Sequence, residues 1–324
     1  MKHALLAVPL LTSLLGGVLA AQAPARVQFI AVEKDVKLEV LDWGGVGRPV
    51  VLLAGNTQTA HSFEQFAPVL ASSYHVYGIT RRGFGASSAP ATGYLADRLA
   101  DDVLAVIDSL RLIRPVLAGH SRAGQELSSI GSRHPEKVAG LVYLDAGYAY
   151  AYYDSTRGNF EIEFNELMRH NEQLHAAGAK GQFVEIDRLL TQLLQTDLPA
   201  LERSFKTMRS ELAGYASGPP RPLMPPPHTG IARAIDEGTQ PYTSIRAPVL
   251  AIYAIDASVP PELQADTAAA QRWLVQQSTP AAAFARGIPT ARVVMIPHAN
   301  HFIFDSNARE VLREMHAFIA RLSP

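Results

Sequence analysis

The chain has 324 residues, and 29 Lys and Arg against 30 Asp and Glu give a formal net charge of -1. This balance, without a basic stripe, argues against nucleic acid as a partner, because phosphate binding needs clustered positive charge. The chain contains no Cys, which excludes disulfides, thiolate zinc sites and cysteine nucleophiles. The hydrophobic content of 48% predicts a compact fold, and serine, aspartate and histidine remain as catalytic candidates.

Residues 1–23 are predicted to form a secretory signal peptide. Lys2 supplies a charged start, Ala4 to Leu19 is an apolar run, and small residues follow. The alternative is a membrane anchor, but this run is interrupted by Gly16 and Gly17 and is shorter than the roughly 20 residues that span a bilayer. We therefore expect a periplasmic or secreted mature protein without stable membrane insertion.

Short apolar runs alternate with helical patterns from Val27 onward. The first two runs, 27–32 and 36–41, predict a hairpin. Six later runs are almost continuously apolar, as strands buried on both faces are: 50–54, 74–79, 116–119, 138–144, 249–254 and 292–296. Apolar positions at helical spacing predict helices over 99–110 and 311–322. This alternation predicts an α/β fold with a mostly parallel eight-stranded sheet flanked by helices.

The stretch from Ala146 to about Ile245 breaks the alternation, because it has helical patterns and no convincing strand. We predict a helical insertion at 147–245 between two core segments, 24–146 and 246–324. Its segment 219–227 has six prolines in nine residues and is expected to be an extended connector. Four tyrosines near its start either line a pocket or pack the insertion on the core: Tyr148, Tyr150, Tyr152 and Tyr153.

The segment from Val116 to Gly124 carries the most chemical information. A predicted strand runs into small residues around Ser121 and then into a helix that ends at His134, before a proline. A serine between small residues at such a junction is typical of a nucleophile elbow, whose tight turn lifts the hydroxyl above the sheet edge. Ala123 stands where glycine is usual, and its side chain is small enough for the turn.

A nucleophilic serine needs a histidine base and an acid to orient it. Asp256 ends a predicted strand, and Pro297 to Phe302, with two histidines, follows the last strand. With these motifs, and with Arg82 to Ser87 and His134 to Ala146, the chain resembles the α/β-hydrolase fold serine hydrolases that carry an inserted helical cap. The resemblance covers residues 27–322, although the insertion matches only in position.

Carried over position by position, the resemblance implies that Ser121 is the nucleophile, His301 the base and Asp256 the orienting acid. His298 is the alternative base, but the register of the loop before the last helix favours His301. Asp145, at the end of the sixth strand, is the alternative acid. Asp256 is preferred because the family usually keeps the acid after the seventh strand.

The resemblance also implies an oxyanion hole made of two backbone amides, those of Asn56 and Arg122. The family commonly has His-Gly at the end of the third strand, whereas this chain has Ala54-Gly55. The bracing histidine is therefore absent, but the glycine still allows the loop to turn. We expect the Arg122 side chain to pair with an acid of the insertion or the core.

The function implied by the resemblance is hydrolysis of a small-molecule carboxylic ester through an acyl-enzyme, without cofactor or metal. A serine nucleophile argues against the haloalkane dehalogenases and epoxide hydrolases of this fold, which use aspartate. One alternative is an aminopeptidase of the proline-iminopeptidase type, in which Glu161, Glu163 or Glu166 would hold an amine. A second alternative is a non-catalytic, ligand-binding member of the fold.

Overall fold

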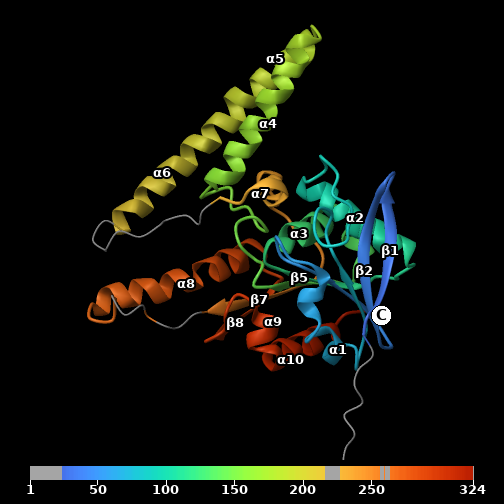
Figure 1. Ribbon diagram of the computed structural model, residues 1–324. Helices are drawn as coiled ribbons and strands as arrows, with labels where there is room; N and C mark the ends of the chain where they lie inside the picture. The colour runs from blue at the N-terminus through green and yellow to red at the C-terminus, as the bar shows by residue number, and fades with distance from the viewer. Residues whose placement is uncertain (1–23, 216–226, 256–258, 260–262, 324) are drawn as a thin grey trace, which may run out of the picture.

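The computed structural model describes residues 24–215, 227–255, 259 and 263–323 (Figure 1). The predicted signal peptide and nearly all of the predicted proline-rich connector lie outside the described residues, and so does Asp256. In the part of the chain that is described, no helix is both long and apolar enough to cross a bilayer.

Eight strands form one sheet in the order β1-β2-β4-β3-β5-β6-β7-β8. The pairs β1–β2 and β2–β4 are antiparallel, and every later pair is parallel. The strands are β1 Arg26–Glu33, β2 Val36–Gly44, β3 Pro49–Leu53, β4 His75–Ile79, β5 Val116–His120, β6 Gly140–Leu144, β7 Val249–Ile255 and β8 Arg292–Pro297. The predicted leading hairpin and mostly parallel eight-stranded sheet are confirmed.

Helices cover both faces of this sheet, which explains why its central strands are apolar throughout. Every residue of β5 and β6 is buried, and successive side chains enter opposite cores. Leu117 and Tyr143 pack with α2 (Ala96–Ser109), α3 (Gly124–Arg133) and α8 (Thr267–Gly287). Ala118 and Val142 pack on the other face, where the helices are α1 Ala67–Leu70, α9 Ile303–Ser306 and α10 Ala308–Ile319. Two-sided burial is the usual state of parallel strands.

The insertion between β6 and β7 is helical in its described part, as predicted. Its helices are α4 Phe160–Ala179, α5 Phe183–Gln192, α6 Leu198–Tyr215 and α7 Gly230–Glu237, and a π-turn at Leu193–Asp197 joins α5 to α6. Helix α4 packs against both α5 and α6, and the three form an elongated arm that projects from the core (Figure 1). The short helix α7 lies between this arm and the core (Figure 1).

The carboxyl ends of β5, β6 and β8 lie on one edge of the sheet because these strands run parallel. Ser121 follows β5, Asp145 follows β6, and the loop with His301 follows β8. Ligands of open α/β sheets bind outside this edge. The topology therefore brings three chemically competent side chains from distant parts of the sequence to the expected place.

Candidate active site

The turn at Ser121 is tight and depends on small residues. Ser121 has a φ of +52°, in the left-handed region that a side chain rarely adopts. A Cβ on Gly124 would lie 2.1 Å from the carbonyl oxygen of Ala146, and one on Gly119 would lie 3.1 Å from the Cβ of Ala123. The elbow therefore needs glycine at 124 and a small side chain at 123, where this chain has alanine. Backbone strain of this kind clusters at functional sites.

Two hydrogen bonds connect Ser121 to a carboxylate through one imidazole. His301 Nε2 lies 2.9 Å from Ser121 Oγ, and His301 Nδ1 lies 2.7 Å from Asp145 Oδ2. Asp145 is 2% exposed, whereas 47% of the His301 side chain is exposed. A buried carboxylate thus orients a ring whose other nitrogen faces the serine hydroxyl, which is the arrangement that activates a serine.

The carboxylate beside His301 belongs to Asp145, so the sequence-based preference for Asp256 is corrected. Nδ1 has one proton to donate, and Asp145 Oδ2 accepts it. Asp145 has a φ of +48°, and its backbone N–H donates to Ile252 O at 2.8 Å. This turn at the end of β6 directs the carboxylate across β7 to the loop after β8. Asp256 itself lies outside the described residues.

The structure places His301, and not His298, against Ser121. His298 is exposed, and its backbone N–H donates to Ile255 O at 2.8 Å as β8 ends. Both ring nitrogens of His301 already have partners. In the described part of the chain, no group of three or more His, Asp or Glu side chains is arranged to hold a metal ion.

His120 holds the loop that carries His301, a role that no sequence pattern indicated. Its side chain is fully buried, and its Nε2 lies 2.9 Å from the carbonyl oxygen of His301. Burial lowers the pKa of His120 to about 4, so the ring is neutral near pH 7 and has one N–H to donate. The two rings lie 4.6 Å apart between centroids. His120 thus joins the elbow to the histidine loop.

The loop after β3 passes directly beside the elbow. A Cβ on Gly55 would lie 3.2 Å from the Cβ of Ser121, so only glycine allows this approach without a shift. The next residue is Asn56, whose amide was predicted to serve the oxyanion hole. Its side-chain Nδ2 donates to Ala232 O on α7 at 3.1 Å. This hydrogen bond ties the loop after β3 to the insertion.

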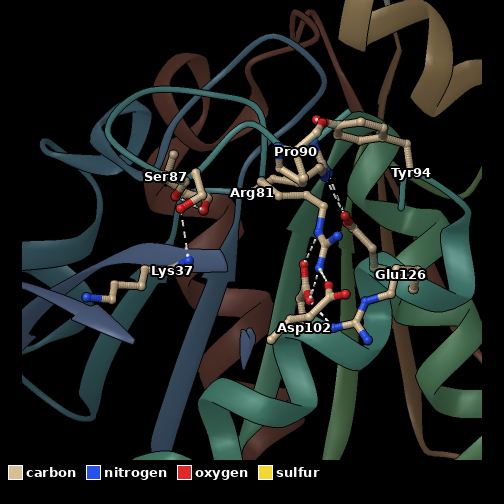
Figure 2. A network of polar contacts seen from close by, with 12 residues as sticks. Lys37, Arg81, Ser87, Pro90, Tyr94, Asp102 and Glu126 are labelled. Atoms are coloured by element: carbon tan, nitrogen blue, oxygen red, sulfur yellow. Dashed lines mark hydrogen bonds and ion pairs between the residues drawn. The ribbon is translucent and has the colours of Figure 1, made fainter. Parts of the chain in front are cut away.

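An arginine braces this loop in place of the histidine common in the family. Arg81 donates to the carbonyl oxygens of Ala54, at 3.0 Å, and Gly55, at 3.1 Å. Its guanidinium is paired with Glu126 of α3 (Figure 2), with one contact of 2.9 Å. Burial raises the pKa of the Glu126 carboxyl, and the charge of Arg81 opposes that rise. This buried pair connects the loop after β3 to α3, the helix that follows Ser121, and sequence reasoning missed it.

The side chain of Arg122 is held by the insertion, as predicted. Its Nη2 lies 2.7 Å from Asp236 Oδ1 on α7, and its guanidinium stands 4.5 Å above the centre of the Tyr150 ring. Such a cation–π contact adds to the ion pair. Helix α7 therefore contacts both residues predicted to supply oxyanion-hole amides, Asn56 and Arg122.

A model of the alpha/beta hydrolase family matches residues 50–314, a range that includes Ser121, Asp145 and His301. The chain belongs to the alpha/beta hydrolase family. The two antiparallel strands β1 and β2 precede the matched range, which otherwise spans most of the sheet and the whole insertion.

Relatives of this alpha/beta hydrolase carry different names. A "putative non-heme haloperoxidase" of Mycobacterium phage D29 is 31% identical over 114 residues, which is 35% of this chain and 41% of that protein. The chain thus spans less than half of that relative. The AB hydrolase superfamily protein YisY of Bacillus subtilis (strain 168) is 28% identical over 236 residues, 69% of this chain and 80% of that protein. The crystal structure of E-2-(acetamidomethylene)succinate hydrolase has a TM-score of 0.53 at 19% identity, covering 91% of this chain and 99% of that chain.

A cavity of about 490 Å³ adjoins the site of this alpha/beta hydrolase. Arg122, the neighbour of Ser121, lies on its wall, together with Glu161. Six aromatic residues also line it: Tyr148, Tyr150, Tyr152, Tyr153, Phe160 and Phe284. The four tyrosines therefore line a pocket, and Tyr150 and Tyr152 also pack on the core, so both interpretations left open by the sequence hold in part. An aromatic cavity of this size suits a small apolar ligand.

The three glutamates considered as amine ligands have different surroundings. Glu163 is buried and accepts a hydrogen bond of 2.6 Å from the hydroxyl of Tyr153. Glu166 is paired with Arg169 on the same helix. Glu161 lines the cavity, and burial raises the pKa of its carboxyl while the charge of Arg122 opposes the rise. Only Glu161 of the three is therefore placed to meet a ligand in the cavity.

Proposed function

We propose that the protein is a serine hydrolase that cleaves carboxylic esters through an acyl-enzyme on Ser121. The observation that carries the proposal is the continuous hydrogen-bond chain from Ser121 through His301 to the buried Asp145. A protein that only binds a ligand has no need of an activated serine at a strained elbow. The family of the chain and the hydrolases among its relatives support an enzymatic role.

In the proposed mechanism His301 Nε2 accepts the proton of Ser121 as Oγ attacks the ester carbonyl carbon. The carbonyl π bond breaks, and the negative charge on its oxygen is held by the backbone amides of Asn56 and Arg122. When the tetrahedral intermediate collapses, the C–O bond to the alcohol breaks and His301 returns the proton to the leaving oxygen. Water then attacks the acyl-enzyme by the same steps and releases the acid.

The cavity supports a preference for uncharged acyl or aromatic groups. Its wall includes six aromatic side chains, and two of its lining residues lie next to the proposed reacting groups: Arg122 follows Ser121, and the Tyr148 hydroxyl bonds to Asp145. An apolar group seated there would leave water and gain roughly 25 cal/mol for each Å² buried. The relatives' peroxidase names are not transferred, because the phage match spans less than half of that protein.

The test is hydrolysis of a panel of p-nitrophenyl esters by the full chain. We expect a burst of p-nitrophenol equal to the concentration of active sites, followed by slower turnover, for esters whose acyl-enzyme is hydrolysed more slowly than it forms. A fluorophosphonate should stop the reaction after one equivalent has reacted with Ser121, as located by peptide mass spectrometry. Absence of turnover over the whole panel, with no labelling, would contradict the proposal and favour a non-catalytic ligand-binding protein.

A second candidate function, hydrolysis of aminoacyl substrates, is favoured by one observation. Glu161 lines the cavity together with six aromatic side chains, and aromatic faces together with a carboxylate bind organic ammonium groups. The neighbouring Arg122 does not neutralise this carboxylate fully, since its guanidinium is already paired with Asp236. An amine on the acyl side of the substrate would therefore find one complementary charge.

Glu161→Gln separates these two functions. We expect kcat/KM for α-aminoacyl p-nitroanilides to fall about tenfold or more if the carboxylate holds the amine, a loss of about 1.4 kcal/mol. The matched acyl p-nitroanilides and esters without the amino group should change little. Glu166→Gln is the control, because Glu166 pairs with Arg169 and does not line the cavity. Equal effects on both substrate series would remove the aminoacyl alternative.

A further inference from the structure

The carboxylate of Asp145 is held at both oxygens. Oδ2 faces His301, and Oδ1 accepts two hydrogen bonds, from the Tyr148 hydroxyl at 2.8 Å and from the backbone N–H of Ala254 at 3.0 Å. A free carboxyl group rotates readily, because its terminal torsion has only broad preferences. Two donors on Oδ1 from different parts of the chain restrict that rotation and leave Oδ2 directed at the imidazole.

Tyr148 is itself held in place by the core. Its ring lies 5.9 Å from the ring of Tyr253, edge to face. The hydroxyl of Tyr253 donates to Gly147 O at 2.5 Å, and a Cβ on Gly147 would lie 2.1 Å from that hydroxyl oxygen. The backbone just before Tyr148 therefore has little freedom, and glycine is needed at 147 for the close approach.

The Tyr148 hydroxyl remains a donor at any pH at which the enzyme would work. Burial, and next the charge of Asp145, raise the pKa of Tyr148 well above its ordinary value. The hydroxyl therefore stays protonated and donates to Asp145 Oδ1, three residues earlier in the sequence.

We propose that Tyr148 is a positioning residue, whose hydroxyl orients the Asp145 carboxylate and through it the His301 ring. The position of Asp145 explains the need. A carboxylate at the end of β6 must extend across β7 to reach the loop after β8. On β7 itself, the backbone N–H of Ala254 donates one hydrogen bond to Asp145 Oδ1. Tyr148, the first tyrosine of the insertion, donates the second hydrogen bond to this oxygen. The inference rests on the proposed function, and it gives Tyr148 a role beyond lining the cavity.

Loss of the Tyr148 hydroxyl has two consequences, one for kcat and one for the pH dependence of kcat/KM. The carboxylate gains rotational freedom, so the imidazole is held less well and kcat falls. The charge formerly shared with the tyrosine hydroxyl concentrates on the carboxylate, which then stabilises a protonated imidazole more strongly. The acidic limb of kcat/KM against pH should consequently move to higher pH.

Tyr148→Phe in the full chain is the test, because phenylalanine keeps the ring and its packing. We expect kcat to fall about tenfold with KM nearly unchanged, by a similar factor for short, long and aromatic acyl esters. The acidic limb should move upward. The downfield proton NMR signal of the His301 Nδ1–H should shift or broaden, a readout that needs no substrate. Tyr242→Phe is the matched control, since its hydroxyl also donates to an aspartate, Asp97, and its side chain does not line the cavity.

Three results would overturn the proposal. An unchanged pH limb together with an unchanged Nδ1–H signal would mean that the hydroxyl does not orient the acid. A loss confined to one class of ester would make Tyr148 a substrate contact instead. A fall in the thermal midpoint with kcat per active site retained would make it a structural residue. If the wild-type chain hydrolyses no ester, the proposed function fails separately, and the NMR comparison still decides the role of Tyr148.

Discussion

Ser121→Ala is expected to lower kcat for p-nitrophenyl ester hydrolysis by at least about 10⁴-fold, because no other hydroxyl is in contact with His301 Nε2 among the described residues. Alanine keeps the Cβ, so the strain at a φ of +52° is unchanged. The thermal midpoint should therefore stay within a few degrees of the wild type. Steady-state kinetics and thermal unfolding of the same preparation check both statements.

The control for this prediction is Ser72→Ala, which removes an exposed hydroxyl that bonds to Val69 O within its own turn. That variant should retain full activity and full fluorophosphonate labelling. Ser121→Ala should take up no label at all. Labelling of a different serine in the wild type, or substantial turnover by Ser121→Ala, would show that Ser121 is not the nucleophile.

Asp145→Asn is expected to have the second largest effect, a loss of up to about 10⁴-fold in kcat, the magnitude seen when a serine triad loses its acid in this way. The amide has nearly the same shape as the carboxylate, but it carries no charge to stabilise the imidazolium. Its NH₂ group, if turned toward Nδ1, also favours the wrong tautomer of His301. Measuring kcat/KM from pH 5 to pH 9 distinguishes a lost acid from a shifted pH optimum.

The comparison with Asp256→Asn decides the assignment. Asp145 is the carboxylate in contact with His301, so we expect Asp256→Asn to stay within a few-fold of wild-type kcat. Both variants are isosteric, and both remove one charge. If Asp256→Asn proves the more damaging of the two, the acid of the triad comes from the end of β7, as the family resemblance first suggested.

Local patterns were sufficient to predict the sheet, the elbow and the histidine. Strands buried on both faces must be apolar throughout. The consecutive apolar residues of Val116 to Gly119 and of Val249 to Ala254 therefore predict buried strands. The elbow is equally local, because Ser121 and its small neighbours meet the steric limits of one turn. His301 was placed by the short loop between the last strand and the last helix.

The choice between two aspartates was beyond the sequence. Asp145 and Asp256 each end a predicted strand, and neither has a neighbour that marks it as the acid. The decision depends on which carboxylate reaches His301, 156 residues from Asp145 along the chain. That reach follows from the pairing of β6, β7 and β8 and from the left-handed turn at Asp145, which are properties of the assembled sheet.

By itself, then, the sequence was enough to predict the α/β architecture, the helical insertion and the candidate residues Ser121 and His301, which local turn and loop patterns mark. Only the tertiary structure decided which side chains support them: Arg81 with Glu126 beside the loop after β3, His120 against the loop that carries His301, and Tyr148 on Asp145. The physical reason is the range of each constraint. Burial and turn sterics act between neighbours in sequence, whereas a hydrogen bond acts only between groups that the fold brings within about 3 Å.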